Sequence, residues 1–202
     1  MSKTELRYQV AKDVFAEVGV DTDAAMDLLD SIPVSIHCWQ IDDLSGFEAP
    51  ERGLSGGIQA TGSDPSKAKN KDEFMRNLTK ALSLVPGKKK LALHAIYLDN
   101  LGAFVDRDAI EPKHFAFWVD YAKEYGLGLD FNPTYFSHKN ADTNFTLSSF
   151  DPSIRAFWIE HGKRCRRISD YLGRQLGQVC IDNHWIPDGY KDYTRSEERR
   201  VG

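Results

Sequence analysis

Cysteine is scarce in this sequence, and its scarcity excludes two kinds of cross-linked architecture. The 202 residues include three cysteines, Cys38, Cys165 and Cys180. An odd, sparse set without regular spacing does not fit a disulfide framework, and no two of them have the spacing of zinc-finger ligands. A reducing compartment, the cytoplasm, is therefore the expected location.

Long apolar runs and clustered positive charge are also missing. The first residues, MSKTELRYQVAKDVF, contain no uninterrupted apolar stretch, so we expect neither a signal peptide nor a membrane span. The formal net charge is -4. The densest basic cluster, residues 88–90, has too few lysines for the electrostatic footprint of a nucleic-acid-binding protein. We expect no nucleic acid and no membrane among the partners.

The short motifs of several enzyme classes are absent as well. No Gly-x-Ser-x-Gly elbow occurs, and the glycine-rich residues 56–62 lack the lysine-serine pair of a phosphate-binding P-loop. They lie in a long polar stretch, residues 42–70, whose length is typical of a functional or mobile loop. We interpret the glycine-rich residues as a flexible lid or substrate loop.

Helical and strand patterns alternate along the rest of the chain. Apolar spacing predicts helices over 4–18, 22–29, 74–85, 112–126 and 152–172, and strands over 33–39, 91–98, 127–133 and 179–186. Thr22 or Asp23 is expected to cap the second helix, and Asp151 with Pro152 to begin the last one. Strands that alternate with helices predict a parallel α/β sheet whose strands are apolar on both faces.

Polar and aromatic side chains stand near the ends of the predicted strands, where barrels of parallel strands place their active sites. The carboxylates among them are Asp130, Asp182 and Asp188. They belong to different segments and form no tight ligand motif, so they do not predict a complete metal site. Four strands are about half of the eight that a closed barrel needs.

Residue chemistry alone leaves two interpretations for His94, Trp39 and Trp185. A histidine among apolar residues is more often a core residue than a functional one, although a position near a strand end favours function. An indole ring can stack on the apolar face of a sugar, but core packing is the more common role of a tryptophan.

Longer strings carry a resemblance that no single motif carries. PVSIHCWQIDDLSGFE, LHAIYLDN, GLGLDFNPTYFSH and NHWIPDGYKD, together and in this order, closely resemble the L-rhamnose isomerase family. The resemblance covers nearly all of the chain from about Leu6 to Asp192.

The resemblance implies a (β/α)8 TIM barrel, of which this chain would supply about the first four βα units and an amino-terminal helical segment. It implies a cytoplasmic homotetramer that isomerises L-rhamnose to L-rhamnulose in rhamnose catabolism, by a metal-assisted hydride shift between C1 and C2. Two divalent metals, preferably Mn2+, would act as Lewis acids.

The resemblance also implies which residues bind the sugar. It assigns substrate binding to His94 in the LHAIYL string and to Trp185 in NHWIPDG, with Trp39 and Phe131 as weaker candidates. The metal ligands of the family lie on later strands. No metal ligand and no catalytic residue is therefore expected in this chain.

The resemblance ends after about Asp192. Residues 1–192 are expected to be the amino-terminal part of one TIM-barrel domain. Residues 193–202 are expected to be a non-native, disordered tail, because RSEERRVG is what a common sequencing-adapter oligonucleotide encodes. The chain by itself is then expected to be an inactive fragment. Two other interpretations stay open, a non-catalytic carbohydrate-binding fragment and another metal-dependent sugar isomerase or epimerase on the same barrel.

Overall fold

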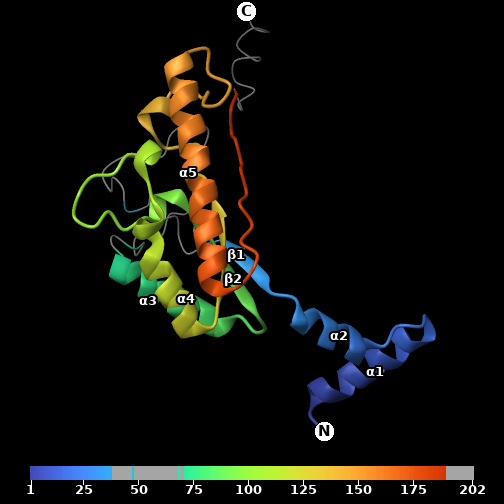
Figure 1. Cartoon of the computed structure of the whole chain (residues 1–202). Helices are drawn as coiled ribbons and strands as arrows, with labels where there is room; N and C mark the ends of the chain where they lie inside the picture. The colour runs from blue at the N-terminus through green and yellow to red at the C-terminus, as the bar shows by residue number, and fades with distance from the viewer. Residues whose placement is uncertain (38–46, 48–67, 69–70, 190–202) are drawn as a thin grey trace, which may run out of the picture.

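The computed structural model describes residues 1–37, 47, 68 and 71–189. Within them, helices pack on a small parallel sheet and two further helices extend from it (Figure 1). The helices are α1 Lys3–Glu17, α2 Thr22–Ser31, α3 Lys71–Leu84, α4 Ala116–Tyr125 and α5 Pro152–Leu176. The 3-10 turns among them are η2 Ala95–Tyr97, η3 Arg107–Ala109, η4 Pro112–Phe115 and η5 Lys139–Ala141. The predicted α/β class is confirmed, whereas the predicted domain boundary at residue 192 lies outside the described residues.

Three parallel strands form the sheet in the order β1-β2-β3. They are β1 Val34–His37, β2 Lys89–His94 and β3 Gly128–Asn132. The strand predicted over 91–98 ends earlier, because the chain turns into η2 after His94. His94 therefore lies at the carboxyl end of β2, in register with Asn132 on β3.

The fourth predicted strand, over 179–186, forms a single bridge in place of a ladder. Asp182 pairs with Phe131 of β3, in parallel. The backbone groups that precede the bridge form hydrogen bonds with side chains. Asp130 Oδ1 accepts from Ile181 N at 2.8 Å, and Lys90 Nζ donates to the Val179 carbonyl at 2.7 Å. The described residues thus show three strands and a bridge where four strands were predicted.

The two faces of the sheet differ in polarity. Apolar strand residues join one core cluster with side chains of α3, α4 and α5; they are Leu91, Leu93, Leu129 and Phe131. Successive side chains of a strand point to opposite faces, so the alternate residues Lys90, His94, Asp130 and Asn132 line the other face. The expectation of strands that are apolar on both faces was wrong, because a buried ion pair of 2.5 Å between Lys90 and Asp130 makes a polar layer possible.

Helices α4 and α5 begin and end near the predicted positions. Pro112 opens η4, which continues into α4, and Gly126 ends α4 with a left-handed φ of 63°. The Asp151 side chain accepts a hydrogen bond from the backbone N–H of Ser153, and Pro152 occupies the first turn of α5. No helix in the described part of the chain is both long and apolar enough to cross a membrane.

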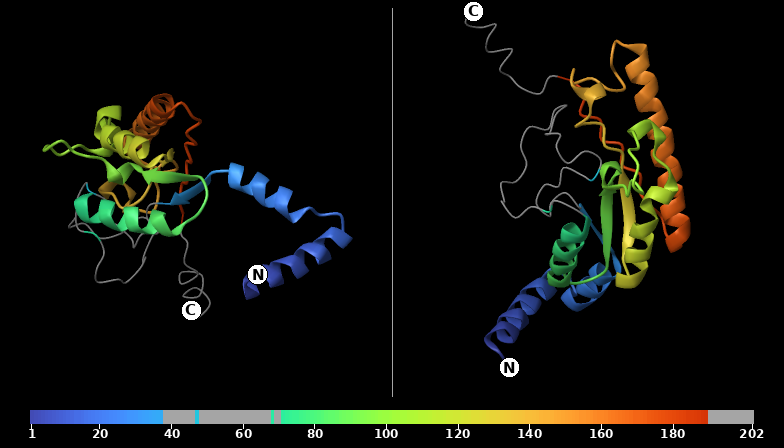
Figure 2. Two further views of the ribbon diagram at one scale, coloured as in Figure 1. Left: turned by 90° about the horizontal axis from the view of Figure 1, so that it is seen from below. Right: turned by 90° about the vertical axis from the view of Figure 1, so that its left-hand side faces the viewer.

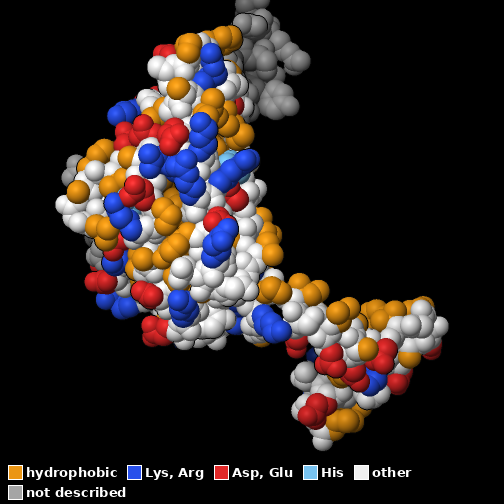
Figure 3. Space-filling model, viewed as in Figure 1, with side chains coloured by type: hydrophobic (Ala, Val, Ile, Leu, Met, Phe, Trp, Pro, Cys, Tyr) orange, Lys and Arg blue, Asp and Glu red, His pale blue; other side chains and the backbone are white. Residues whose placement is uncertain are grey.

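Helices α1 and α2 form an arm that extends away from the sheet (Figures 1 and 2). Both helices form where the sequence predicts them, although α2 is capped by Asp21 and not by Thr22 or Asp23. Neither helix has a buried residue. The predicted apolar face of α1, which includes Leu6 and Val10, stays exposed, and Figure 3 shows hydrophobic side chains along the arm.

Candidate functional site

His94 lies at the carboxyl end of β2 with 1% of its surface exposed. Its Nδ1 lies 3.3 Å from the Thr134 hydroxyl. Burial, together with the charges of His37 and Arg107, lowers the pKa of His94 to about 3. The imidazole is therefore neutral near pH 7, with one nitrogen that donates a hydrogen bond and one that accepts.

Phe136 links His94 to Trp185, the two main candidates for sugar binding. The ring of Phe136 meets the His94 ring at a centroid distance of 6.0 Å and the Trp185 ring at 5.6 Å, both edge to face. Trp185 keeps 37% of its surface exposed. The structure thus brings the two residues, which are far apart in the sequence, into contact with one aromatic ring.

The two weaker candidates are placed differently. Phe131 has no exposed surface and its ring meets Phe115 edge to face, with 5.1 Å between centroids, inside the core cluster. Trp39 lies outside the described residues. Sequence reasoning missed Phe136, because no periodic pattern extends into the loop after β3; only its place in the GLGLDFNPTYFSH string gave a signal.

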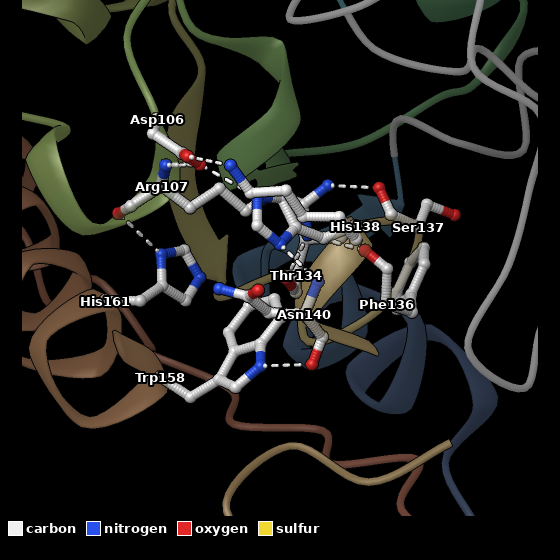
Figure 4. A network of polar contacts seen from close by, with 10 residues as sticks. Asp106, Arg107, Thr134, Phe136, Ser137, His138, Asn140, Trp158 and His161 are labelled. Atoms are coloured by element: carbon white, nitrogen blue, oxygen red, sulfur yellow. Dashed lines mark hydrogen bonds and ion pairs between the residues drawn. The ribbon is translucent and has the colours of Figure 1, made fainter. Parts of the chain in front are cut away.

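Arg107 holds the loop that carries Phe136 (Figure 4). Its guanidinium is fully buried and donates to three carbonyl groups of the loop, those of Thr134 at 2.6 Å, Phe136 at 2.5 Å and Ser137 at 3.0 Å. His161 of α5 in turn donates from Nδ1 to the Arg107 carbonyl at 2.9 Å. A planar guanidinium that satisfies several carbonyl groups fixes the backbone of the loop more firmly than a single bond would.

His138 holds the end of the same loop that follows Ser137 (Figure 4). Its Nε2 donates to Asp106 Oδ1 at 2.8 Å, and its Nδ1 accepts from Asn140 N at 3.1 Å. Burial and the nearby Arg107 charge lower the pKa of His138 to about 4, although Asp106 opposes the shift. A neutral His138 donates at one nitrogen and accepts at the other, as both bonds require.

A chain of hydrogen bonds supports the segment that carries Trp185. Tyr135 donates from its hydroxyl to His184 Nδ1 at 2.9 Å, and His184 Nε2 donates to Asp182 Oδ2 at 2.8 Å. Burial raises the pKa of Tyr135, so its hydroxyl keeps the proton that this bond needs. The chain ties the segment after the bridge to the loop after β3.

Comparison with known proteins identifies the family to which this arrangement belongs. Residues 2–200 match the sequence model of the family described as "L-rhamnose isomerase (RhaA)". The chain belongs to the L-rhamnose isomerase family. The resemblance seen in the sequence strings is thereby confirmed.

Three curated relatives named L-rhamnose isomerase show how much of the family the chain spans. The protein of Listeria monocytogenes serotype 4a (strain HCC23) is 55% identical over 186 residues, which are 92% of this chain and 44% of the relative. The protein of Mannheimia succiniciproducens is 54% identical over 193 residues, 96% and 46% of the two chains. The protein of Yersinia pseudotuberculosis serotype IB (strain PB1/+) is 56% identical over 188 residues, which are 93% of this chain and 45% of the relative. The chain spans about half the length of the curated relatives it matches.

The described part of this chain does not gather a metal centre. Nowhere in residues 1–37, 47, 68 and 71–189 do three histidine, cysteine, aspartate or glutamate side chains lie together so that they could hold an ion. The carboxylates named from the sequence have other partners: Asp130 pairs with Lys90, Asp182 with His184, and Asp188 with Thr146 and Ser148. These residues do not fit the divalent metals that the resemblance implies.

Proposed function

We propose that this chain forms one side of the sugar pocket of an enzyme that isomerises L-rhamnose to L-rhamnulose. The observation that carries the proposal is the row His94, Phe136 and Trp185 beside the carboxyl ends of the strands, in a chain of the L-rhamnose isomerase family. In barrels of parallel strands this end holds the substrate.

The aldose–ketose conversion moves a hydrogen between C1 and C2 of the open-chain sugar. Divalent metals would act as Lewis acids that polarise the sugar oxygens. The family resemblance implies that the preferred metal is Mn2+. We assign their ligands, and the rest of the (β/α)8 barrel, to the part of the relatives' length that this chain does not span. The assembly proposed from the resemblance is a cytoplasmic homotetramer.

The residues of this chain would bind and orient the sugar. A neutral His94 can exchange hydrogen bonds with a sugar oxygen without placing a charge beside it. The Trp185 ring offers a rigid apolar surface for the C–H face of the sugar, and it keeps water away from that face. Trp39 remains a weaker candidate, and Phe131 would act from the core by supporting β3.

The decisive variant is His94→Ala, in a polypeptide of the relatives' full length that contains these residues. Loss of a group that orients the substrate is expected to lower kcat/KM for L-rhamnose by about 100-fold. The measurement is ketose formation in the presence of Mn2+.

The matched control is His114→Ala, which removes another buried histidine, 4% exposed, whose Nδ1 accepts from the Glu111 backbone at 2.9 Å. This variant measures the effect of losing a buried imidazole that lies outside the row of His94, Phe136 and Trp185. Unchanged kinetics of the His94→Ala enzyme, or an equal loss in both variants, would remove the proposed role of His94.

A further inference from the structure

The segment 179–189 lies beside α5 and is fastened at several points along its length (Figure 1). At its start, Asp130 accepts a hydrogen bond from the Ile181 N–H and Lys90 donates one to the Val179 carbonyl. At the bridge, the backbone of Phe131 forms two hydrogen bonds of 2.8 Å, with Ile181 and Asn183. Beyond Trp185 the backbone has no strand partner among the described residues, so a different kind of contact must hold it there.

Asp188 provides that contact. Its Oδ1 accepts from the backbone N–H of Thr146 at 2.9 Å and from the Thr146 hydroxyl at 2.5 Å. Its Oδ2 accepts from the backbone N–H of Ser148 at 2.9 Å and from the Ser148 hydroxyl at 2.6 Å. Gly189 N adds a bond of 2.9 Å to the Asn144 carbonyl. The carboxylate therefore clamps the segment onto the loop that precedes α5.

Trp185 stands between this clamp and the Tyr135–His184 bond. The backbone on one side is held by His184 and the backbone on the other by Asp188, three residues further on. The indole ring, 37% exposed, then meets Phe136 at 5.6 Å. The two anchors thus hold the backbone that carries the indole ring beside Phe136.

We propose that Asp188 is a positioning residue for the sugar pocket: its carboxylate, by accepting four hydrogen bonds from the loop at Thr146 and Ser148, holds Trp185 against Phe136. The inference rests on the proposed function, because it concerns the same pocket. A wall residue contacts the sugar alike in the ground state and in the transition state, so its displacement raises KM and leaves kcat nearly unchanged.

The kinetic test uses Asp188→Ala and Asp188→Asn in the full-length polypeptide. Asp188→Ala is expected to raise KM for L-rhamnose about tenfold, with kcat within about twofold. Asp188→Asn should give a smaller rise, because its amide oxygen keeps the acceptor for one residue while its NH2 group faces the other donors. The matched control is Asp151→Ala, which also loses a carboxylate that accepts two bonds from one serine, Ser153, yet only caps α5.

A double-mutant cycle separates positioning from a general loss of stability. In a Trp185→Ala background, Asp188→Ala should cause no further rise in KM, because the ring that it positions is gone. An equal rise in both backgrounds, or no rise in either, would overturn the inference.

Hydrogen exchange followed by mass spectrometry gives a readout that needs no activity. Backbone amides of residues 183–189 should exchange faster in Asp188→Ala and remain unchanged in Asp151→Ala. Unchanged exchange in Asp188→Ala overturns the clamp even if the enzyme isomerises L-rhamnose. An unsubstituted enzyme without isomerase activity would refute the proposed function instead, and the exchange experiment would still decide the role of Asp188.

Discussion

At the scale of single residues, the site depends on groups that are buried and neutral. His94 and His138 both have a pKa far below that of a free imidazole, mainly because burial disfavours the charged form. The Arg107 guanidinium lies near them and donates hydrogen bonds to carbonyl groups of the loop. In the proposed pocket wall, His94 and His138 thus supply hydrogen-bonding groups without a charge of their own.

Gly162 shows how closely α5 approaches Tyr135 and His184. A Cβ at this position would lie 2.7 Å from the Tyr135 hydroxyl oxygen and 3.6 Å from His184 Cε1. We expect Gly162→Ala to lower the free energy of unfolding by about 1–3 kcal/mol, because overpacking displaces a hydroxyl that is bonded to His184. Urea unfolding measures the loss.

The Tyr135→Phe background provides the control for this expectation. Without the hydroxyl oxygen, Gly162→Ala should cost clearly less, whereas Gly173→Ala, whose Cβ would meet the Gln178 carbonyl at 2.8 Å, should cost the same in both backgrounds. An identical cost of Gly162→Ala with and without the hydroxyl would show that the contact is not the cause.

At the scale of elements, side chains replace part of a strand ladder. Asp130 accepts from Ser35, Lys90 and the Ile181 backbone at once, and so joins β1, β2 and β3 to the segment that follows α5. This polar layer explains why a short bridge is enough to hold the segment 179–189 on the sheet.

Lys90→Met tests the importance of this layer. The substitution leaves the Asp130 carboxylate buried without its cation, and we expect the free energy of unfolding to fall by about 3–5 kcal/mol. Urea unfolding followed by circular dichroism measures the change, with the exposed Lys88→Met as a matched control. A loss no larger than that of the control would mean that the remaining hydrogen bonds to Asp130 suffice.

At the scale of the whole molecule, buried histidines couple stability to pH. The pKa is lowered to about 3 in His94 and His161 and to about 4 in His138, in each case chiefly by burial. In the unfolded chain these histidines have a pKa of about 6.5. Between these values the unfolded state binds more protons than the folded state, so the free energy of unfolding falls as the pH drops below ~6.5.

We therefore expect the urea midpoint to fall as the pH is lowered from 7.5 to 5.5. His138→Gln should be less stable at pH 7.5, but it should show a smaller difference between the two pH values, because one of the titrating groups is gone. A midpoint that is constant or rises on acidification would contradict the burial of neutral histidines.

Local sequence determined much of the element pattern. Asp151 and Pro152 begin α5, Gly126 ends α4, and apolar spacing placed α1 and α2, because caps, turns and helix periods depend on neighbours within a few residues. The family could also be predicted from the sequence, because long strings of residues resemble it.

Only the tertiary structure decided which of these residues meet. His94 and Trp185 approach through Phe136, Asp130 replaces a backbone partner, and the apolar side chains of α1 stay largely exposed. Each of these outcomes depends on the path of the chain between residues that are far apart in sequence. Local propensity does not encode that path, which is set by the burial of the shared core.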